Sequence, residues 1–157
     1  MSKVNMINLR HHFDTINTNM RSLTSLATKK QISQRLQLKK IKVNKQINGV
    51  GKSSMNANYS TNIQIKSKYS EYTANLYCNI LPNIVGQQPS CPINTNLFVI
   101  PKNITLADPT YYQPQNIDLL ISATLFFELL CVGQIKLGHE LPIYKKNVFG
   151  WISFLVI

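Results

Sequence analysis

The chain has 157 residues, 44% of them hydrophobic, and a formal net charge of +11 at pH 7. This length predicts a single domain with a buried core, and a mean hydropathy of -0.08 is typical of a soluble globular chain rather than a disordered one. The three cysteines include no Cys-x-x-Cys pair, which argues against a disulfide framework or a structural zinc site. We therefore expect free thiols that act as small buried hydrophobic side chains, no metal or other cofactor, and a cytoplasmic location.

The positive charge is concentrated in the first part of the chain. Residues 1–68 contain 13 Lys or Arg and one acid, Asp14, whereas residues 69–157 contain four Lys and five acids. Such asymmetry is typical of a solvated basic face, and also of proteins that bind nucleic acid. The basic segment 29–52 contains no aromatic residue that could stack on a base, so we favour the solvated face. Weak nucleic-acid binding through this segment remains the alternative.

No membrane partner is expected. The most apolar stretch, residues 117–135, contains Asp118 and Glu128, whereas a spanning helix needs about 20 mostly apolar residues. The start of the chain has no apolar run behind its charges, so it does not predict a signal peptide.

Residues 1–21 are polar and without clear period, and we interpret them as a leader. Good helix formers without Gly or Pro predict a helix over 24–38. Alternating or short apolar runs predict strands around 41–43 and 63–65, over 73–80 and over 97–100.

Proline and glycine predict loops over 82–92 and 108–115, followed by an apolar strand over 117–121 and a helix over 123–132. Short strands with one or two short helices favour a mostly-β fold, either a small barrel or a sandwich.

A glycine-rich segment joins two of the predicted strands. It consists of Ile47, Asn48, Gly49, Val50 and Gly51. Asn-Gly supplies the positive φ that a tight hairpin needs, and two glycines let the backbone approach a peptide closely. The segment is therefore either an ordinary hairpin turn or a lid that closes over an extended peptide.

Several spaced segments occur in a fixed order: Thr28–Lys30, Gln34–Leu38, Ile100–Pro109, Asp118–Ile121, Leu129–Ile135 and Phe149–Ile152. This series resembles the retropepsin-like aspartic peptidase domain of BEL/Pao-type retrotransposon polyproteins. The resemblance covers about residues 22–152 and leaves 153–157 as a truncated apolar tail. It implies a small retropepsin-like β-barrel that forms a homodimer, binds a peptide substrate and cleaves its own polyprotein.

The resemblance also assigns roles to particular residues. It implies that the glycine-rich segment at 47–51 is the flap over the substrate. It further implies that Asp118, Leu120, Ile121 and Ser122 form the strand and helix start that brace the catalytic loop. Ser122 stands where such proteases have glycine.

The carboxyl group that this chemistry needs is missing from the expected turn. Aspartic proteases use two carboxylates that share one proton, each from an Asp-Ser/Thr-Gly turn of one subunit. None of the three aspartates of this chain, Asp14, Asp108 and Asp118, precedes Ser/Thr-Gly. The formal position of the family aspartate is Asn19, which cannot act as a general base.

We therefore expect the first catalytic strand to be missing or replaced and this copy to be inactive. The chain also contains no G-x-S-x-G, P-loop or H-E-x-x-H motif that would indicate another chemistry. A non-catalytic remnant that dimerises or binds peptide is the alternative function.

Overall fold

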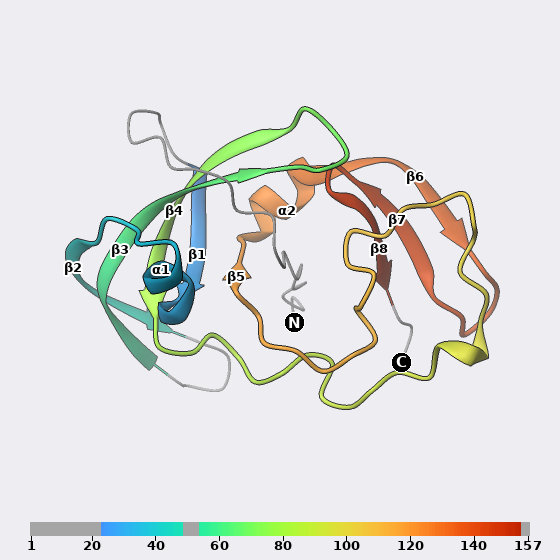
Figure 1. Cartoon of the computed structure of the whole chain (residues 1–157), viewed down its shortest axis with the longest axis horizontal. Coiled ribbons are helices and arrows are strands. Elements are labelled where there is room, and N and C mark those ends of the chain that lie inside the picture. Colours follow the sequence, from blue (N-terminus) through green and yellow to red (C-terminus); the bar gives the residue numbers. More distant parts are fainter. Residues whose placement is uncertain (1–22, 49–53, 155–157) are drawn as a thin grey trace.

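The computed structural model describes residues 23–48 and 54–154, which form two β-sheets and two short α-helices (Figure 1). The elements follow in the order β1 (Leu23–Lys29), α1 (Lys30–Arg35), β2 (Ile41–Asn48), β3 (Ser54–Lys66), β4 (Thr73–Leu81), η2 (Thr95–Leu97), β5 (Leu119–Leu120), α2 (Ala123–Leu129), β6 (Leu130–Lys136), β7 (Ile143–Asn147) and β8 (Gly150–Phe154). The predicted mostly-β class is confirmed.

The larger sheet has the strand order β2-β3-β4-β1-β5. Strand β1 runs parallel to β4 and antiparallel to β5, so it joins an early and a late part of the chain. The alternation predicted over 73–80 is confirmed, because Ala74, Leu76, Cys78 and Ile80 are buried on one face. At the end of β4, Asn79 and Leu81 of the other face are buried as well.

The smaller sheet is an antiparallel meander of β6, β7 and β8. The loop at 105–107 lies along its β8 edge: the Ala107 amide donates to the Trp151 carbonyl, and the Trp151 amide donates to the Thr105 carbonyl, each at 2.8 Å. Gly150 makes this approach possible. A Cβ there would lie 2.8 Å from the Ala107 nitrogen, and its φ of +114° also favours glycine.

The main core lies where α2 meets the larger sheet, and Figure 1 shows α2 between the two sheets. Leu125, Phe126 and Leu129 of α2 are buried together with Leu119 of β5 and Leu76 of β4. The expected closed barrel is not formed, because no described strand of one sheet pairs with a strand of the other. The connection at 82–118 contributes only isolated bridges and the turn η2 instead of a closing strand.

The helix predicted over 24–38 is wrong in its first half. Residues 23–29 form β1, which has hydrogen-bonded neighbours on both sides, and only Lys30–Arg35 are helical. Partners distant in sequence override a local helix preference in this way. The helix predicted over 123–132 ends at Leu129, and Val132 in β6 is 100% exposed instead of lying on a buried helix face.

Two further expectations fail on the long connection. The predicted strand 97–100 is absent, because η2 ends at Leu97, and both Leu97 and Val99 are exposed. Cys91 is also exposed, whereas Cys78 is buried as expected. In the described ranges, no helix combines the length and apolar character needed to cross a membrane.

Two adjacent phenylalanines of α2 provide a matched test of this core. Phe126 is 4% exposed and Phe127 is 66% exposed, and their rings meet edge to face at 5.5 Å. We expect Phe126→Ala to lower the free energy of unfolding by about 3–5 kcal/mol. Phe127→Ala, the same truncation at the surface, should cost about 1 kcal/mol at most. Urea denaturation measures both, and equal losses would contradict this placement of α2.

Candidate functional site

The two strands of the hairpin that was expected to be a flap are formed. β2 and β3 pair antiparallel out to Asn48 opposite Ser54, so the chain reverses between these residues. Gly49, Val50 and Gly51 of the expected tip lie outside the described residues. Ile47 is half-buried and packs against a small cluster formed by Ala27, Ala57 and Leu81. This contact anchors the free end of the hairpin beside β1.

The expected bracing strand lies directly against β1. Ala27 pairs with Leu120 and Thr28 with Leu119. The Lys29 amide donates a hydrogen bond to the Asp118 carbonyl at 3.1 Å, and the Thr28 hydroxyl donates to the same oxygen at 3.3 Å. Asp118 therefore contributes its main-chain carbonyl to the fold, across 90 residues of sequence.

The turn from β5 into α2 is closed by the predicted residues Ile121 and Ser122. The Ile121 side chain is buried in the core, and the half-buried Ser122 is the N-cap of α2. Its hydroxyl accepts a hydrogen bond from the Leu125 amide at 3.2 Å, and its carbonyl accepts one from the Phe126 amide. Serine satisfies a free amide that glycine would leave to water, which accounts for serine at this position.

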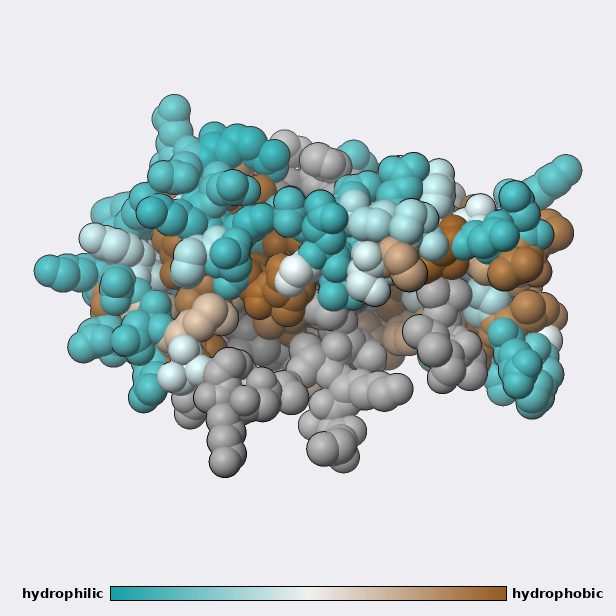
Figure 2. All heavy atoms as spheres, turned by 90° about the horizontal axis from the view of Figure 1, so that it is seen from below, coloured by the Kyte–Doolittle hydropathy of each residue, from teal (hydrophilic) through white to brown (hydrophobic). Residues whose placement is uncertain are grey.

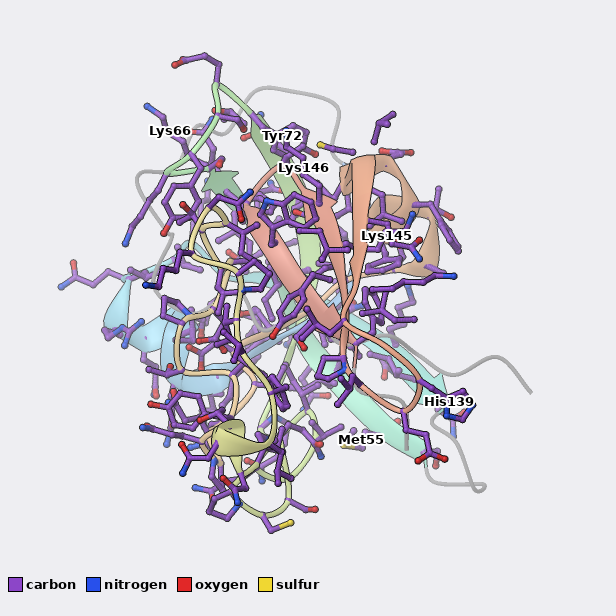
Figure 3. All side chains as sticks on the ribbon, turned by 90° about the vertical axis from the view of Figure 1, so that its right-hand side faces the viewer. Met55, Lys66, Tyr72, His139, Lys145 and Lys146 are labelled. Atoms are coloured by element: carbon purple, nitrogen blue, oxygen red, sulfur yellow. The ribbon has the colours of Figure 1, made fainter. Side chains whose placement is uncertain are left out.

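Asp108 and His139 make their described contacts with residues near them in sequence, not with this junction of β1 and β5. Asp108 is held in its own turn, because its Oδ1 accepts from the Thr110 amide at 3.0 Å and from the Thr110 hydroxyl at 2.9 Å. His139 lies in the turn between β6 and β7 and points outward, with its Nδ1 3.9 Å from Glu140 (Figure 3). Asn19, the formal position of the family aspartate, lies outside the described residues.

No group of three or more His, Cys, Asp or Glu side chains that could hold a metal ion occurs within residues 23–48 and 54–154. In the same ranges the candidate site consists of backbone hydrogen bonds, apolar packing and a serine cap. These groups hold the fold together, and they include no side chain placed to activate water.

A buried group of hydroxyls was not predicted from the sequence. Tyr144 in β7 pairs with Ser153 in β8, and the Tyr111 hydroxyl from the preceding loop meets both. Tyr144 is 0% exposed. Burial raises the pKa of Tyr111 above its ordinary value, and the neighbouring Tyr144 hydroxyl raises it further, while Ser153 opposes the rise. Tyr111 lies in a loop well before β7 in the sequence, so only the folded structure brings its hydroxyl beside the pair on β7 and β8.

No protein-family model, curated protein or solved structure matches this chain. What the site can do therefore has to be argued from its own residues.

The cap at Ser122 can be tested by graded substitution. Ser122→Ala should lower the free energy of unfolding by about 1 kcal/mol, because an amide of the first helical turn loses its acceptor. Ser122→Gly should cost only about 0.3 kcal/mol and Ser122→Asp should be close to neutral, since glycine and aspartate both suit an N-cap. Thermal and urea unfolding measure the series. Equal losses for all three variants would contradict a capping role.

The raised pKa of Tyr111 predicts weakening at alkaline pH. Above pH 10, the ordinary pKa of tyrosine, the unfolded chain loses the phenol proton before the folded chain does. The contribution of Tyr111 is therefore complete below pH 10 and is lost as the pH rises further. Tyr111→Phe cannot ionise, so its stability should fall less steeply in this range. Urea midpoints at increasing pH, with phenolate absorbance as the parallel readout, check this, and identical slopes would contradict it.

Proposed function

We propose that this chain is a retropepsin-like domain of retroelement origin that has lost endopeptidase activity. The observation that carries the proposal is a contrast between scaffold and chemistry. None of the three aspartates precedes Ser/Thr-Gly, although the strand–helix brace and the arms of the glycine-rich hairpin are both formed.

The scaffold supports the proposal at two points. In a retropepsin-like domain an apolar strand followed by a short helix braces the chain next to the active site. Here β5 pairs with β1, and the Thr28 and Lys29 bonds to the carbonyl of Asp118, just before β5, extend this contact. The β2–β3 hairpin belongs to the same sheet and contacts this region through Ile47, which packs on the Ala27 cluster.

The chemistry accounts for the loss. One carboxylate of an aspartic dyad must deprotonate water while its neighbour, still protonated, polarises the scissile carbonyl. An asparagine amide at position 19 does not titrate in this range and cannot replace either group. Asp118 serves the fold through its backbone carbonyl, and the Asp108 carboxylate is engaged by Thr110.

The proposed remaining role is to bind peptide, or a second copy of the chain, without cleavage. A retropepsin site is assembled at a two-fold axis, so a homodimer is the natural partner of such a scaffold. The exposed Val132 in β6 and Phe127 at the end of α2 are apolar surface that a protein partner would cover.

The test is peptide cleavage by folded protein from acidic to neutral pH, with and without pepstatin. Turnover by the native chain should not exceed that of an Asp14→Asn/Asp118→Asn variant. This variant removes two of the three aspartates and keeps Asp108, whose carboxylate is already bound by Thr110. Pepsin under the same conditions verifies substrate and inhibitor. Pepstatin-sensitive turnover by the native chain that the double variant loses would overturn the proposal.

A further inference from the structure

The strongest charge on the molecule gathers at one end of the larger sheet. Between residues 23 and 68, the described part contains basic residues and no acidic residue. The basic residues are Lys29, Lys30, Arg35, Lys39, Lys40, Lys42, Lys45, Lys66 and Lys68. Lys39, Lys40, Lys42 and Lys45 are exposed and occupy the edge strand β2 and the residues just before it. We call these four the β2 lysines.

The fold places an aromatic ring among these lysines. Tyr59 in β3 lies directly opposite Lys42 in β2, so both side chains project from the same face of the sheet. Tyr59 is 45% exposed. Two residues further along β3, on the same face, the Thr61 hydroxyl donates to the Lys39 carbonyl at 2.9 Å. The start of β2 therefore passes along one side of an accessible ring, and β4 lies on the other side of β3.

From this arrangement we propose that the β2 lysines and Tyr59 form a binding surface for single-stranded nucleic acid. Lysine ammonium groups attract successive phosphates, and an exposed tyrosine offers a face on which one base can stack. Figure 2 shows hydrophilic side chains at the end of the molecule where Figure 1 places β2. This inference does not depend on the proposed peptidase origin.

Three features decide between possible occupants. A second copy is disfavoured, because pairing β2 with another β2 would bring lysines against lysines. An acidic peptide would satisfy the charges but has no group that requires the ring of Tyr59. A duplex keeps its bases stacked inside, so the ring could not reach one, whereas a single strand presents both phosphates and base faces.

The size of the surface sets the expected salt dependence. The chain from Lys39 to Lys45 spans about 20 Å at most, which suits a short run of nucleotides. Neutralising up to four phosphates of a single strand gives a slope of log affinity against log salt of about -3.

Fluorescence anisotropy with a labelled single-stranded RNA of mixed sequence tests the proposal on the full chain. The patch variant replaces the β2 lysines by glutamine: Lys39→Gln, Lys40→Gln, Lys42→Gln and Lys45→Gln. A control variant removes the same charge from exposed lysines elsewhere: Lys68→Gln, Lys102→Gln, Lys136→Gln and Lys146→Gln. Lys146 of this control lies in β7, on the smaller sheet (Figure 3).

We expect the patch variant to lose more than about tenfold in affinity and most of the salt slope, and the control variant to lose about threefold or less. Tyr59→Ala should weaken binding by about five- to a hundredfold, whereas Tyr59→Phe, which keeps the ring, should bind like the native chain. Circular dichroism and urea midpoints identify any variant that fails to fold, and for such a variant single lysine changes replace the fourfold one.

Three outcomes would overturn the proposal. Equal losses in the two fourfold variants would show that net charge alone attracts the RNA. If a duplex binds as tightly as a single strand and Tyr59→Ala changes neither affinity, Tyr59 does not stack on a base. Binding of a labelled poly-glutamate peptide without binding of RNA would assign the surface to an acidic protein segment.

Discussion

The fold depends on the position of β1 between β4 and β5. Main-chain hydrogen bonds on both edges of β1 join residues 23–29 to segments about fifty and ninety positions later in the chain. The bonds from Thr28 and Lys29 to the Asp118 carbonyl lie at the C-terminal end of β1. The α2 core includes Leu119 of β5, which pairs with β1, and the cluster under the hairpin includes Ala27 of β1. Both parts of the candidate site are therefore positioned by β1.

This dependence on β1 concerns the contacts of the fold and not catalytic side chains. β1 is held by backbone hydrogen bonds to β4 and β5, and none of these bonds needs a carboxylate side chain. Residues 117–129 supply buried apolar side chains, a carbonyl acceptor and a helix cap to this part of the fold.

Charge and apolar contacts divide the molecule in a second way. The four β2 lysines lie on β2 and just before it, at the sheet edge farthest from β5. Phe127 of α2 and Val132 of β6 are exposed apolar side chains away from that edge, and Leu97 and Val99 are exposed on the long connection. The β2 lysines and these apolar side chains therefore belong to different elements, and they suit partners of different chemistry.

Some of this was determined by the sequence itself. The period of two in 73–80 determined β4 and its buried face, and proline and glycine marked the loops at 82–92 and 108–115, because these signals act over a few residues. Ile121 and Ser122 were correctly placed at the entry to a helix. The missing Asp-Ser/Thr-Gly turn can also be read from the sequence alone.

Tertiary structure decided the rest. Residues 24–29 have good helix formers but become a strand, because their partners in β4 and β5 satisfy more backbone groups than a local helix would. The predicted strand 97–100 finds no partner and is not formed. Lys42 faces Tyr59 because β2 pairs with β3, and the loop residue Tyr111 lies beside Tyr144 and Ser153 only in the folded chain. Local patterns report on neighbours a few residues apart, whereas these contacts depend on which strands lie side by side.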